Sequence, residues 1–201
     1  MNLSSVKVKK QIQYYEKLRE KFRTKREIVG WGSKKSQQMR FNVIKNYIKE
    51  NNCKNLLDIG CGRGDLVNYL NKNQIKIKYI GLDINHNFIQ IAKKRNPKNF
   101  FRVGNFLNTK IKSFDLIFIS GIFNLKMKNH EKFMKTFIKK AFKKTKKILI
   151  FNCLSANAKI KKKLHYYINP FEISKNYNIN LEKLIIDHSY ADHDVSFILF
   201  K

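Results

Sequence analysis

The chain is poor in acidic residues and cysteines, and it has no long apolar run. Its 201 residues carry 14 acidic side chains against 43 basic ones, a formal net charge of +29. Cys53, Cys61 and Cys153 are not spaced as metal ligands, so we expect no metal site and a reducing environment. Without a run of about eighteen apolar residues, no membrane-spanning helix is expected. The N-terminus lacks the apolar core of a secretion signal, so the sequence predicts a cytoplasmic protein.

The most informative segment is residues 55–65, which read Asn-Leu-Leu-Asp-Ile-Gly-Cys-Gly-Arg-Gly-Asp. Leu56, Leu57 and Ile59 form a short apolar run, typical of a strand buried on both faces of a parallel sheet. The glycines let the backbone turn sharply and approach a ligand where a Cβ would clash. Residues 65–70 then have the apolar spacing of a helix start. This order predicts a pocket in which backbone N–H groups and the positive end of a helix bind a nucleotide-type ligand.

The spacing of the glycines distinguishes between ligands. A dinucleotide site requires Gly-x-Gly-x-x-Gly or Ala, but Asp65 stands at the last position. The pattern is instead one acidic residue followed by glycines at every second position: Asp58, Gly60, Gly62 and Gly64. This resembles the first motif of class I S-adenosylmethionine (SAM)-dependent methyltransferases. The resemblance implies that Asp58 supports the methionine end of the cofactor and that the glycine turn, including Cys61, binds it. The alternative is a structural strand–helix turn without a ligand.

A carboxylate stands where the same family places one. Residues 77–83 read as the next strand, and Asp83 lies at its end. A carboxylate roughly twenty residues after a glycine turn is well placed to accept hydrogen bonds from the two ribose hydroxyls. Ile84 and Phe88 flank it and are expected to contact the adenine ring. The alternative for Asp83 is the N-cap of a helix predicted over residues 85–92.

Two more strand ends complete the predicted cofactor site. Residues 99–106 read as a strand that ends in Gly-Asn. Methyltransferases of this class often carry Asp here, so the resemblance implies that Asn105 contacts adenine through its side-chain carbonyl, beside Phe106. A second apolar strand begins at residue 114 and runs into a loop containing Ser120. Since ligands of open α/β sheets bind at the carboxyl ends of the strands, we expect Ser120 to face the cofactor.

Strands alternate with helices along the rest of the chain, which predicts a doubly wound α/β fold. We expect seven strands, beginning near residues 56, 77, 99, 114, 146, 180 and 195. The apolar spacing of residues 130–144 predicts a helix before the fifth strand. The resemblance implies a mostly parallel, Rossmann-like sheet with the last strand inserted antiparallel. It places the SAM-binding methyltransferase domain at residues 49–201.

Residues 1–48 are predicted to form an N-terminal helical extension or lid, with helices over residues 6–22 and 36–49. Trp31, in the loop between them, either closes over the cofactor as an aromatic lid or anchors the core. Arg40 is either a partner for the carboxylate of the cofactor's methionine moiety or a surface arginine.

The acceptor side is indicated by fewer residues. Four candidates could contact the acceptor or remove its proton: Asn124, His165, Tyr166 and His188. An oxygen or nitrogen acceptor often needs its proton removed, and histidine titrates near neutrality. Each of the four is alternatively an ordinary polar turn residue. The segments around Trp31, Asn124 and Tyr166 are similar to a group of small bacterial methyltransferases of mostly unassigned substrate. That likeness implies a small-molecule acceptor.

The absence of certain motifs and the excess of lysine both bear on which kind of acceptor, if any, is methylated. No Asn-Pro-Pro-Tyr, Asp-Pro-Pro-Tyr or Pro-Cys sequence is present, which disfavours methylation of nucleic-acid bases. Lysine pairs at 139–140, 143–144 and 146–147 and the lysines at 161–163 are either solvated surface or a face that binds phosphates. The second interpretation would make the chain an RNA methyltransferase, or give it weak nucleic-acid binding. A third possibility is a binding protein without catalysis on a methyltransferase fold.

Overall fold

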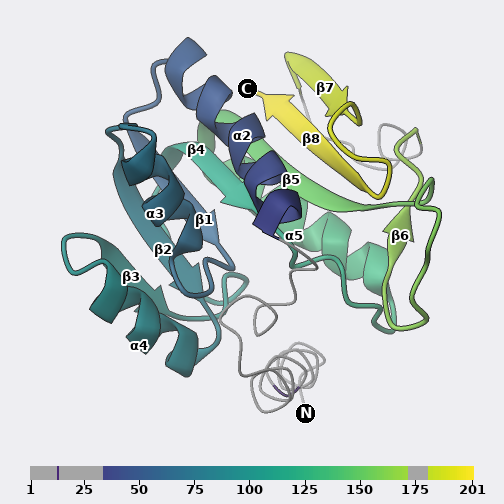
Figure 1. The fold of residues 1–201 in the computed structure, drawn as a ribbon, viewed down its shortest axis with the longest axis horizontal. Helices are drawn as coiled ribbons and strands as arrows, with labels where there is room; N and C mark the ends of the chain where they lie inside the picture. Colours follow the sequence, from purple (N-terminus) through teal and green to yellow (C-terminus); the bar gives the residue numbers. More distant parts are fainter. Residues whose placement is uncertain (1–12, 14–33, 172–180) are drawn as a thin grey trace.

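The structure is a computed structural model that describes Gln13, residues 34–171 and residues 181–201. The predicted helix at residues 6–22 and the loop with Trp31 lie outside the described residues, apart from Gln13. The described residues form a central β-sheet with helices on both faces, so the predicted α/β class is confirmed (Figure 1). Within them, no helix combines the length and apolarity needed to cross a bilayer.

The described residues contribute eight strands to one sheet, in the order β3-β2-β1-β4-β5-β8-β7, with β6 paired to β5. They are β1 (Asn55–Ile59), β2 (Lys78–Asp83), β3 (Phe100–Val103), β4 (Phe114–Ile119), β5 (Thr145–Ser155), β6 (Tyr167–Ile168), β7 (Lys183–Asp187) and β8 (Asp194–Phe200). The expected number was seven; β6 is the additional strand, and two residues are too short to show a period in the sequence. Strand β8 is antiparallel to β5 and β7, which confirms the expected antiparallel insertion.

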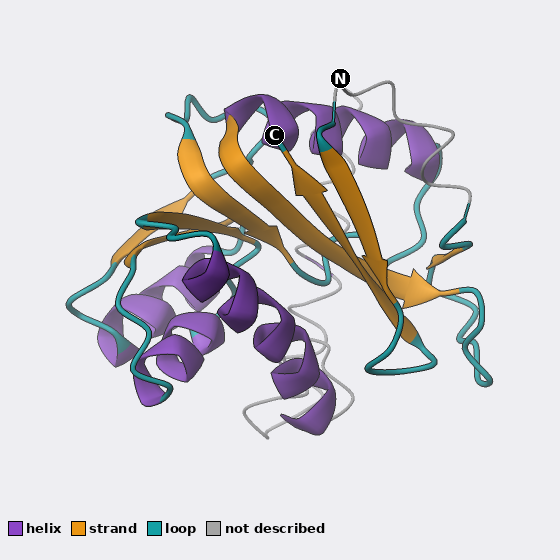
Figure 2. Cartoon of the chain, turned by 90° about the horizontal axis from the view of Figure 1, so that it is seen from above, coloured by secondary structure: helices purple, strands orange, loops and turns teal. Residues whose placement is uncertain are grey.

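Four helices from the described part of the chain flank the sheet: α2 (Lys34–Glu50), α3 (Asp65–Lys72), α4 (His86–Arg95) and α5 (His130–Lys144). The bounds of α5 confirm the prediction from its apolar spacing. Its buried Phe137 and Ile138 pack against one face of the sheet, with Leu149 of β5 in the same cluster. The apolar residues of α2, α3 and α4 pack against the other face, where Ile44 of α2 and Ile150 of β5 belong to the same cluster. Figure 2 shows the sheet between these two layers.

The order of the strands determines where a ligand can bind. Strands β1 to β5 run parallel, so their carboxyl ends meet at one edge of the sheet. Strand β1 lies between β2 and β4. Strands β2 and β3 are added on one side of β1, and β4 and β5 are added on its other side, so the strand order changes direction at this point. Open α/β sheets bind ligands in the crevice at such a switch point. The glycine turn follows β1 and therefore stands in that crevice.

Candidate functional site

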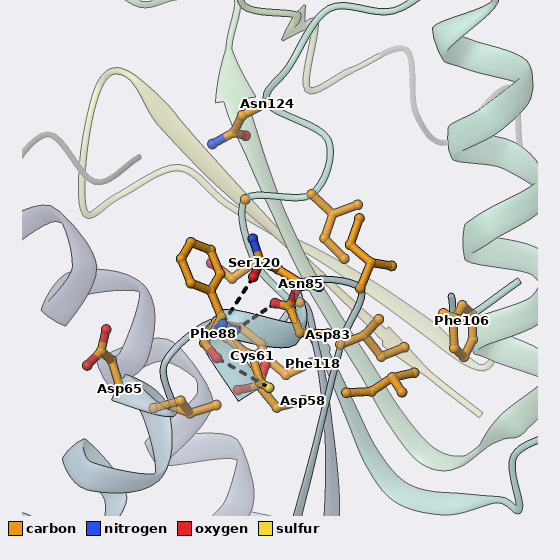
Figure 3. Close-up of a pocket in the computed structure, with 18 of the residues that line it drawn as sticks. Asp58, Cys61, Asp65, Asp83, Asn85, Phe88, Phe106, Phe118, Ser120 and Asn124 are labelled. Atoms are coloured by element: carbon orange, nitrogen blue, oxygen red, sulfur yellow. Dashed lines mark hydrogen bonds between the residues drawn. The ribbon is translucent and has the colours of Figure 1, made fainter. Parts of the chain in front are cut away.

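A pocket opens at the carboxyl edge of β1, β2 and β4 (Figure 3). Its lining includes most of the residues predicted from sequence: Arg40, Asp58, Gly60, Cys61, Gly62, Asp83, Ile84, Asn105, Phe106, Ser120, Asn124 and His165. Gly64, Tyr166 and His188 are not among the lining residues. In Figure 3, Asp58, Cys61 and Asp83 lie together, and Asn124 stands apart from them on the loop after β4.

The glycine turn has a backbone that other residues adopt only with strain. Gly60, Gly62 and Gly64 have φ values of 77°, 53° and 73°. The N–H of Gly60 donates to the carbonyl of Leu82 at 2.7 Å, which ties the turn to the end of β2. A Cβ on Gly60 would lie 2.8 Å from Cγ1 of Ile122, closer than a Cβ normally approaches another carbon, so any residue other than glycine would force a shift. The turn therefore presents bare backbone to the pocket.

Gly64 has a different role from the other two glycines. It precedes α3 as the N-cap residue. A Cβ at this position would come 2.8 Å from Nδ2 of Asn96 and 3.1 Å from the ring of Phe101. The structure thus places Gly64 where α3 packs closely against neighbouring elements, behind the pocket.

Asp83 connects the glycine turn to the next helix. Its Oδ2 accepts the N–H of Gly62 at 2.8 Å, and its Oδ1 accepts the N–H of Asn85 at 2.8 Å. The N-cap of α4 is Asn85, whose Oδ1 accepts the N–H of Phe88 at 3.1 Å. Burial raises the pKa of Asp83, and its hydrogen bonds from backbone N–H groups partly offset this rise. A carboxylate has about four acceptor positions, so Asp83 retains capacity to accept from a ligand.

Two other ionisable groups at the turn are buried. Asp58 accepts a hydrogen bond from the hydroxyl of Tyr79 at 2.6 Å. Burial raises the pKa of Asp58 to about 7, and the Tyr79 hydrogen bond partly offsets this rise. Burial also raises the pKa of the Cys61 thiol well above its usual value, with Asp83 and Asp58 adding to the effect. Cys61 is therefore a neutral thiol near pH 7 and is unsuited to act as a nucleophile.

The loop after β3 forms another wall of the pocket. Asn105, Phe106 and Leu107 line it together with Ile84 and Phe88 from the loop and helix after β2. The Oδ1 of Asn105 accepts the N–H of Leu107 at 3.0 Å, so the side-chain carbonyl expected to contact adenine also shapes its own loop. The two apolar walls are suited to a flat aromatic ring.

Lys140 of α5 holds this loop in place. Its Nζ donates to the carbonyls of Phe106, Leu107 and Thr109 at 2.7, 2.8 and 3.2 Å. The same ammonium lies 5.1 Å from the centre of the Phe106 ring, a cation–π contact. Burial lowers the pKa of Lys140, with Lys144 as a second cause. Lys140 therefore positions the wall of the pocket without lining it.

The loop after β4 provides polar atoms that are not engaged. Ser120 Oγ and Asn124 Oδ1 are buried, and neither has a hydrogen-bond partner among the described residues. The backbone N–H of Asn124 donates to the carbonyl of Gly121 at 3.2 Å, and Gly121 has φ 77°. The loop is thus a tight turn that directs Ser120 and Asn124 to the pocket.

His165 and Tyr166 belong to a chain segment that pairs with this loop. Leu125 and His165 form an antiparallel bridge, and the N–H of Tyr166 donates to the carbonyl of Asn124 at 2.9 Å. Burial, with Lys162 as a second cause, lowers the pKa of His165. Its imidazole is therefore neutral near pH 7 and can accept a proton.

The side chain of Tyr166 is engaged away from the pocket. Its ring stacks on His130 with centroids 3.8 Å apart, and its hydroxyl donates to Glu131 at 3.2 Å. His188 is engaged elsewhere too, with Nε2 2.7 Å from Oγ of Ser155. The structure thus brings Asn124 and His165 to the pocket, and not Tyr166 or His188.

Arg40 lines the pocket from α2, but its guanidinium has a protein partner. It forms a buried ion pair with Asp194 of β8. The other oxygen of Asp194 accepts the hydroxyl of Tyr190 at 2.9 Å, and that hydroxyl also lies 2.7 Å from Oγ of Ser196. Arg40 is buried, so the alternative of a surface arginine is wrong. Because Arg40 also lines the pocket, its contact with the carboxylate of the cofactor stays a prediction beside the ion pair with Asp194.

Sequence reasoning missed several residues of the site. Asp65, Asn85, Leu107 and Ile122 line the pocket, and Lys140 supports it. Asp65 and Asn85 could have been found, since an acidic residue in the first turn of a helix and Asn before a helix are local signals. Nothing local identifies Ile122 or Lys140, whose contacts exist only in the folded chain.

A family model described as a methyltransferase domain matches residues 50–190. The plantazolicin methyltransferase BpumL, solved in complex with a triazolic desmethylPZN analogue and SAH (S-adenosylhomocysteine), is 14% identical; the match covers 85% of this chain and 86% of that one, with a TM-score of 0.68. Magnesium protoporphyrin IX methyltransferase from Synechocystis PCC 6803 with bound SAH is 10% identical over 82% and 83%, with a TM-score of 0.64.

A SAM-dependent methyltransferase from Clostridium acetobutylicum is 13% identical over 81% of this chain and 91% of that one, with a TM-score of 0.61. No curated protein matches this sequence. At these identities the solved structures establish the fold, and the family model establishes the family. The chain belongs to the methyltransferase domain family, which confirms its resemblance to the class I SAM-dependent methyltransferases.

Proposed function

We propose that this methyltransferase transfers a methyl group from SAM to an oxygen or nitrogen atom of a small-molecule acceptor. The observation that carries the proposal is the pair of buried atoms, Ser120 Oγ and Asn124 Oδ1, which have no partner among the described residues. A buried polar group left unsatisfied costs about 1–3 kcal/mol. The sequence predicts that Ser120 faces the cofactor; we instead assign it, with Asn124, to the acceptor, because both groups lie on the loop after β4 and are suited to bind the polar atoms of an acceptor.

The residues of the pocket fit SAM. The bare glycine turn leaves room for close contact, since a Cβ on Gly60 would fill it. Asp83 has acceptor positions left for the ribose hydroxyls, and Asp58 can support the methionine end. Ile84, Phe88 and Leu107 provide apolar contact for adenine. The relatives solved with SAH or SAM support this cofactor.

The contribution of the protein to the reaction is binding, alignment and proton transfer. SAM supplies the activated methyl group. Holding donor and acceptor close and aligned lowers the barrier by several kcal/mol. We expect Asn124 to orient the acceptor and the neutral His165 to accept its proton, because both residues line the pocket. The magnesium protoporphyrin IX and plantazolicin methyltransferases of similar fold favour an acceptor other than nucleic acid.

Methyl transfer from labelled SAM into the fractions of a cell extract tests this proposal. We expect label in the small-molecule fraction and its loss with Asn124→Ala, while SAM affinity measured by calorimetry stays within about twofold. Asn108→Ala is the matched control, because Asn108 is exposed on the loop after β3. Label that appears in RNA, or an Asn124→Ala chain with full transfer, would contradict the proposal.

RNA methylation is the second candidate. Lys132, Lys135 and Lys139 are all exposed along one side of α5. Such a stripe attracts polyanions, and each phosphate contact makes binding depend on salt. If RNA is the acceptor, binding should survive moderate salt and should weaken when these lysines are replaced by glutamine.

A further inference from the structure

The chain segment between β5 and β6 exposes aliphatic side chains to solvent. Ile160 is 83% exposed and Leu164 is 63% exposed. Four exposed lysines stand beside and between them: Lys159, Lys161, Lys162 and Lys163. We call residues 159–164 the basic–apolar loop. Two large aliphatic residues held in water within six positions are an unfavourable arrangement unless a partner covers them.

The basic–apolar loop is fixed in place. The backbone N–H of Lys162 donates to the hydroxyl of Tyr167 at 2.7 Å, and the N–H of His165 donates to the carbonyl of Lys162 at 3.0 Å. The ammonium of Lys161 lies 6.0 Å from the centre of the Tyr167 ring. The loop is therefore folded back on β6, and these contacts hold its aliphatic side chains outward.

The basic–apolar loop also adjoins the pocket, through the residue that follows it. The carbonyl of Leu164 accepts the N–H of Lys126 at 2.8 Å, and the next residue, His165, lines the pocket. Leu125, bridged to His165, lines it too. Lys126 and Lys128 are exposed on the adjacent loop and add positive charge, while Glu131 is bound by the hydroxyl of Tyr166. Whatever covers the basic–apolar loop thus lies beside the acceptor side of the pocket.

The chemistry of the side chains distinguishes between partners. Nucleic acid is bound by lysine and arginine together with aromatic rings that stack on bases. Ile160 and Leu164 can neither stack on a base nor donate a hydrogen bond. Aliphatic residues flanked by lysines match an anionic lipid surface, where apolar groups enter the acyl boundary and ammonium groups stay among the headgroups.

We propose that the basic–apolar loop docks the protein on an anionic lipid surface. Docking would place the pocket against the headgroup layer, because the loop continues directly into His165. The acceptor is then an amphiphile whose methylated oxygen or nitrogen lies in that layer, and this second step rests on the proposed function. The docking step does not depend on the identity of the acceptor.

Co-sedimentation of the full chain with lipid vesicles tests docking. Vesicles with about one third phosphatidylglycerol are compared with pure phosphatidylcholine at moderate salt. We expect binding to the anionic vesicles alone. Ile160→Ser with Leu164→Ser should reduce the partition coefficient about tenfold or more, because less apolar surface enters the membrane. Lys161→Gln with Lys163→Gln should reduce it about fivefold per lysine.

Lys93→Gln with Lys94→Gln on α4 is the matched control, since it removes the same charge at exposed positions beside β3, at the other edge of the sheet from β6 (Figure 1). We expect this control to bind vesicles nearly as well as the unmodified chain. Equal loss in the control and loop variants would overturn the proposal, as would no preference for anionic vesicles. Binding of an RNA oligonucleotide that depends on Lys161 and Lys163 but not on Ile160 and Leu164, with no vesicle binding, would also overturn it.

SAM binding is measured on the same preparation by calorimetry. Vesicle binding without SAM binding would support docking and contradict the proposed function. SAM binding without vesicle binding would overturn the docking proposal and leave the proposed function intact.

Discussion

The cofactor-facing and acceptor-facing parts of the pocket differ in how their polar atoms are engaged. On the cofactor side, the carboxylate of Asp83 is bound by two backbone N–H groups, and that of Asp58 is bound by Tyr79. On the acceptor side, Ser120 Oγ and Asn124 Oδ1 have no partner among the described residues. The cofactor side is fixed before any ligand binds, whereas these acceptor-side atoms still need partners.

This difference explains how each side would bind its ligand. A preorganised site loses little conformational freedom on binding, so its affinity comes from groups already in position. Polar atoms without partners reject a ligand that cannot satisfy them, so they set specificity. We therefore expect the cofactor side to bind a ligand shared across the family, and the proposed acceptor side to set the substrate of this particular chain.

The largest expected effect tests whether Arg40 belongs to the fixed part of the pocket. Arg40→Met leaves the carboxylate of Asp194 buried without its charged partner, which should lower the free energy of unfolding by about 3–5 kcal/mol. Urea unfolding measures this loss. Combining Arg40→Met with Asp194→Asn should restore part of it. If Arg40→Met changes SAM affinity and leaves stability unchanged, Arg40 serves the cofactor instead.

Asp83→Ala should have the next largest effect. It removes a carboxylate expected to bind the ribose and also releases the N–H groups of Gly62 and Asn85. Loss of a charge-assisted hydrogen bond predicts a decrease in SAM affinity of about 1–3 kcal/mol, measured by calorimetry. Asp192→Ala is the control, because Asp192 is an exposed carboxylate. Unchanged affinity would remove Asp83 from the cofactor site.

Two adjacent lysines compare a fixed side chain with a solvated one. Lys140→Met removes the hydrogen bonds to the loop after β3 and should lower the free energy of unfolding by about 1–2 kcal/mol, less than a fully buried charge would give. SAM affinity should fall several-fold. Lys139→Met, at an exposed position, should change neither quantity. Equal effects of the two substitutions would show that the contacts of Lys140 contribute neither to stability nor to SAM affinity.

The stability of the chain should also depend on pH through Asp58, the buried carboxyl beside the glycine turn. Burial raises the pKa of Asp58 from its usual 3.8 to about 7, so the native state binds this proton more tightly than the unfolded chain does. The resulting stabilisation is complete below about pH 4 and is lost as the pH rises through about 7. Asp83 titrates in the same direction, and Asp58→Asn isolates the share of Asp58. If the free energy of unfolding depends on pH in the same way for the unmodified chain and for Asp58→Asn, the raised pKa of Asp58 is ruled out.

Local patterns predicted the glycine turn, Asp83 and the bounds of α5, because each of these depends on neighbours within a few residues. The partners of Arg40 and Lys140 could not be predicted in this way. Asp194 is 154 positions from Arg40, and the carbonyl of Phe106 is 34 positions from Lys140. Such pairs form only when distant elements pack, and Lys140 reads in the sequence like Lys139, its solvated neighbour.

The central claim is that the glycine turn and the carboxylates beside it bind SAM. Calorimetric titration of the full chain with SAM tests this claim most directly, because it requires no knowledge of the acceptor. We predict binding at one molecule per chain and markedly weaker binding by Asp83→Ala. A folded chain that releases no heat with either SAM or SAH would contradict the account.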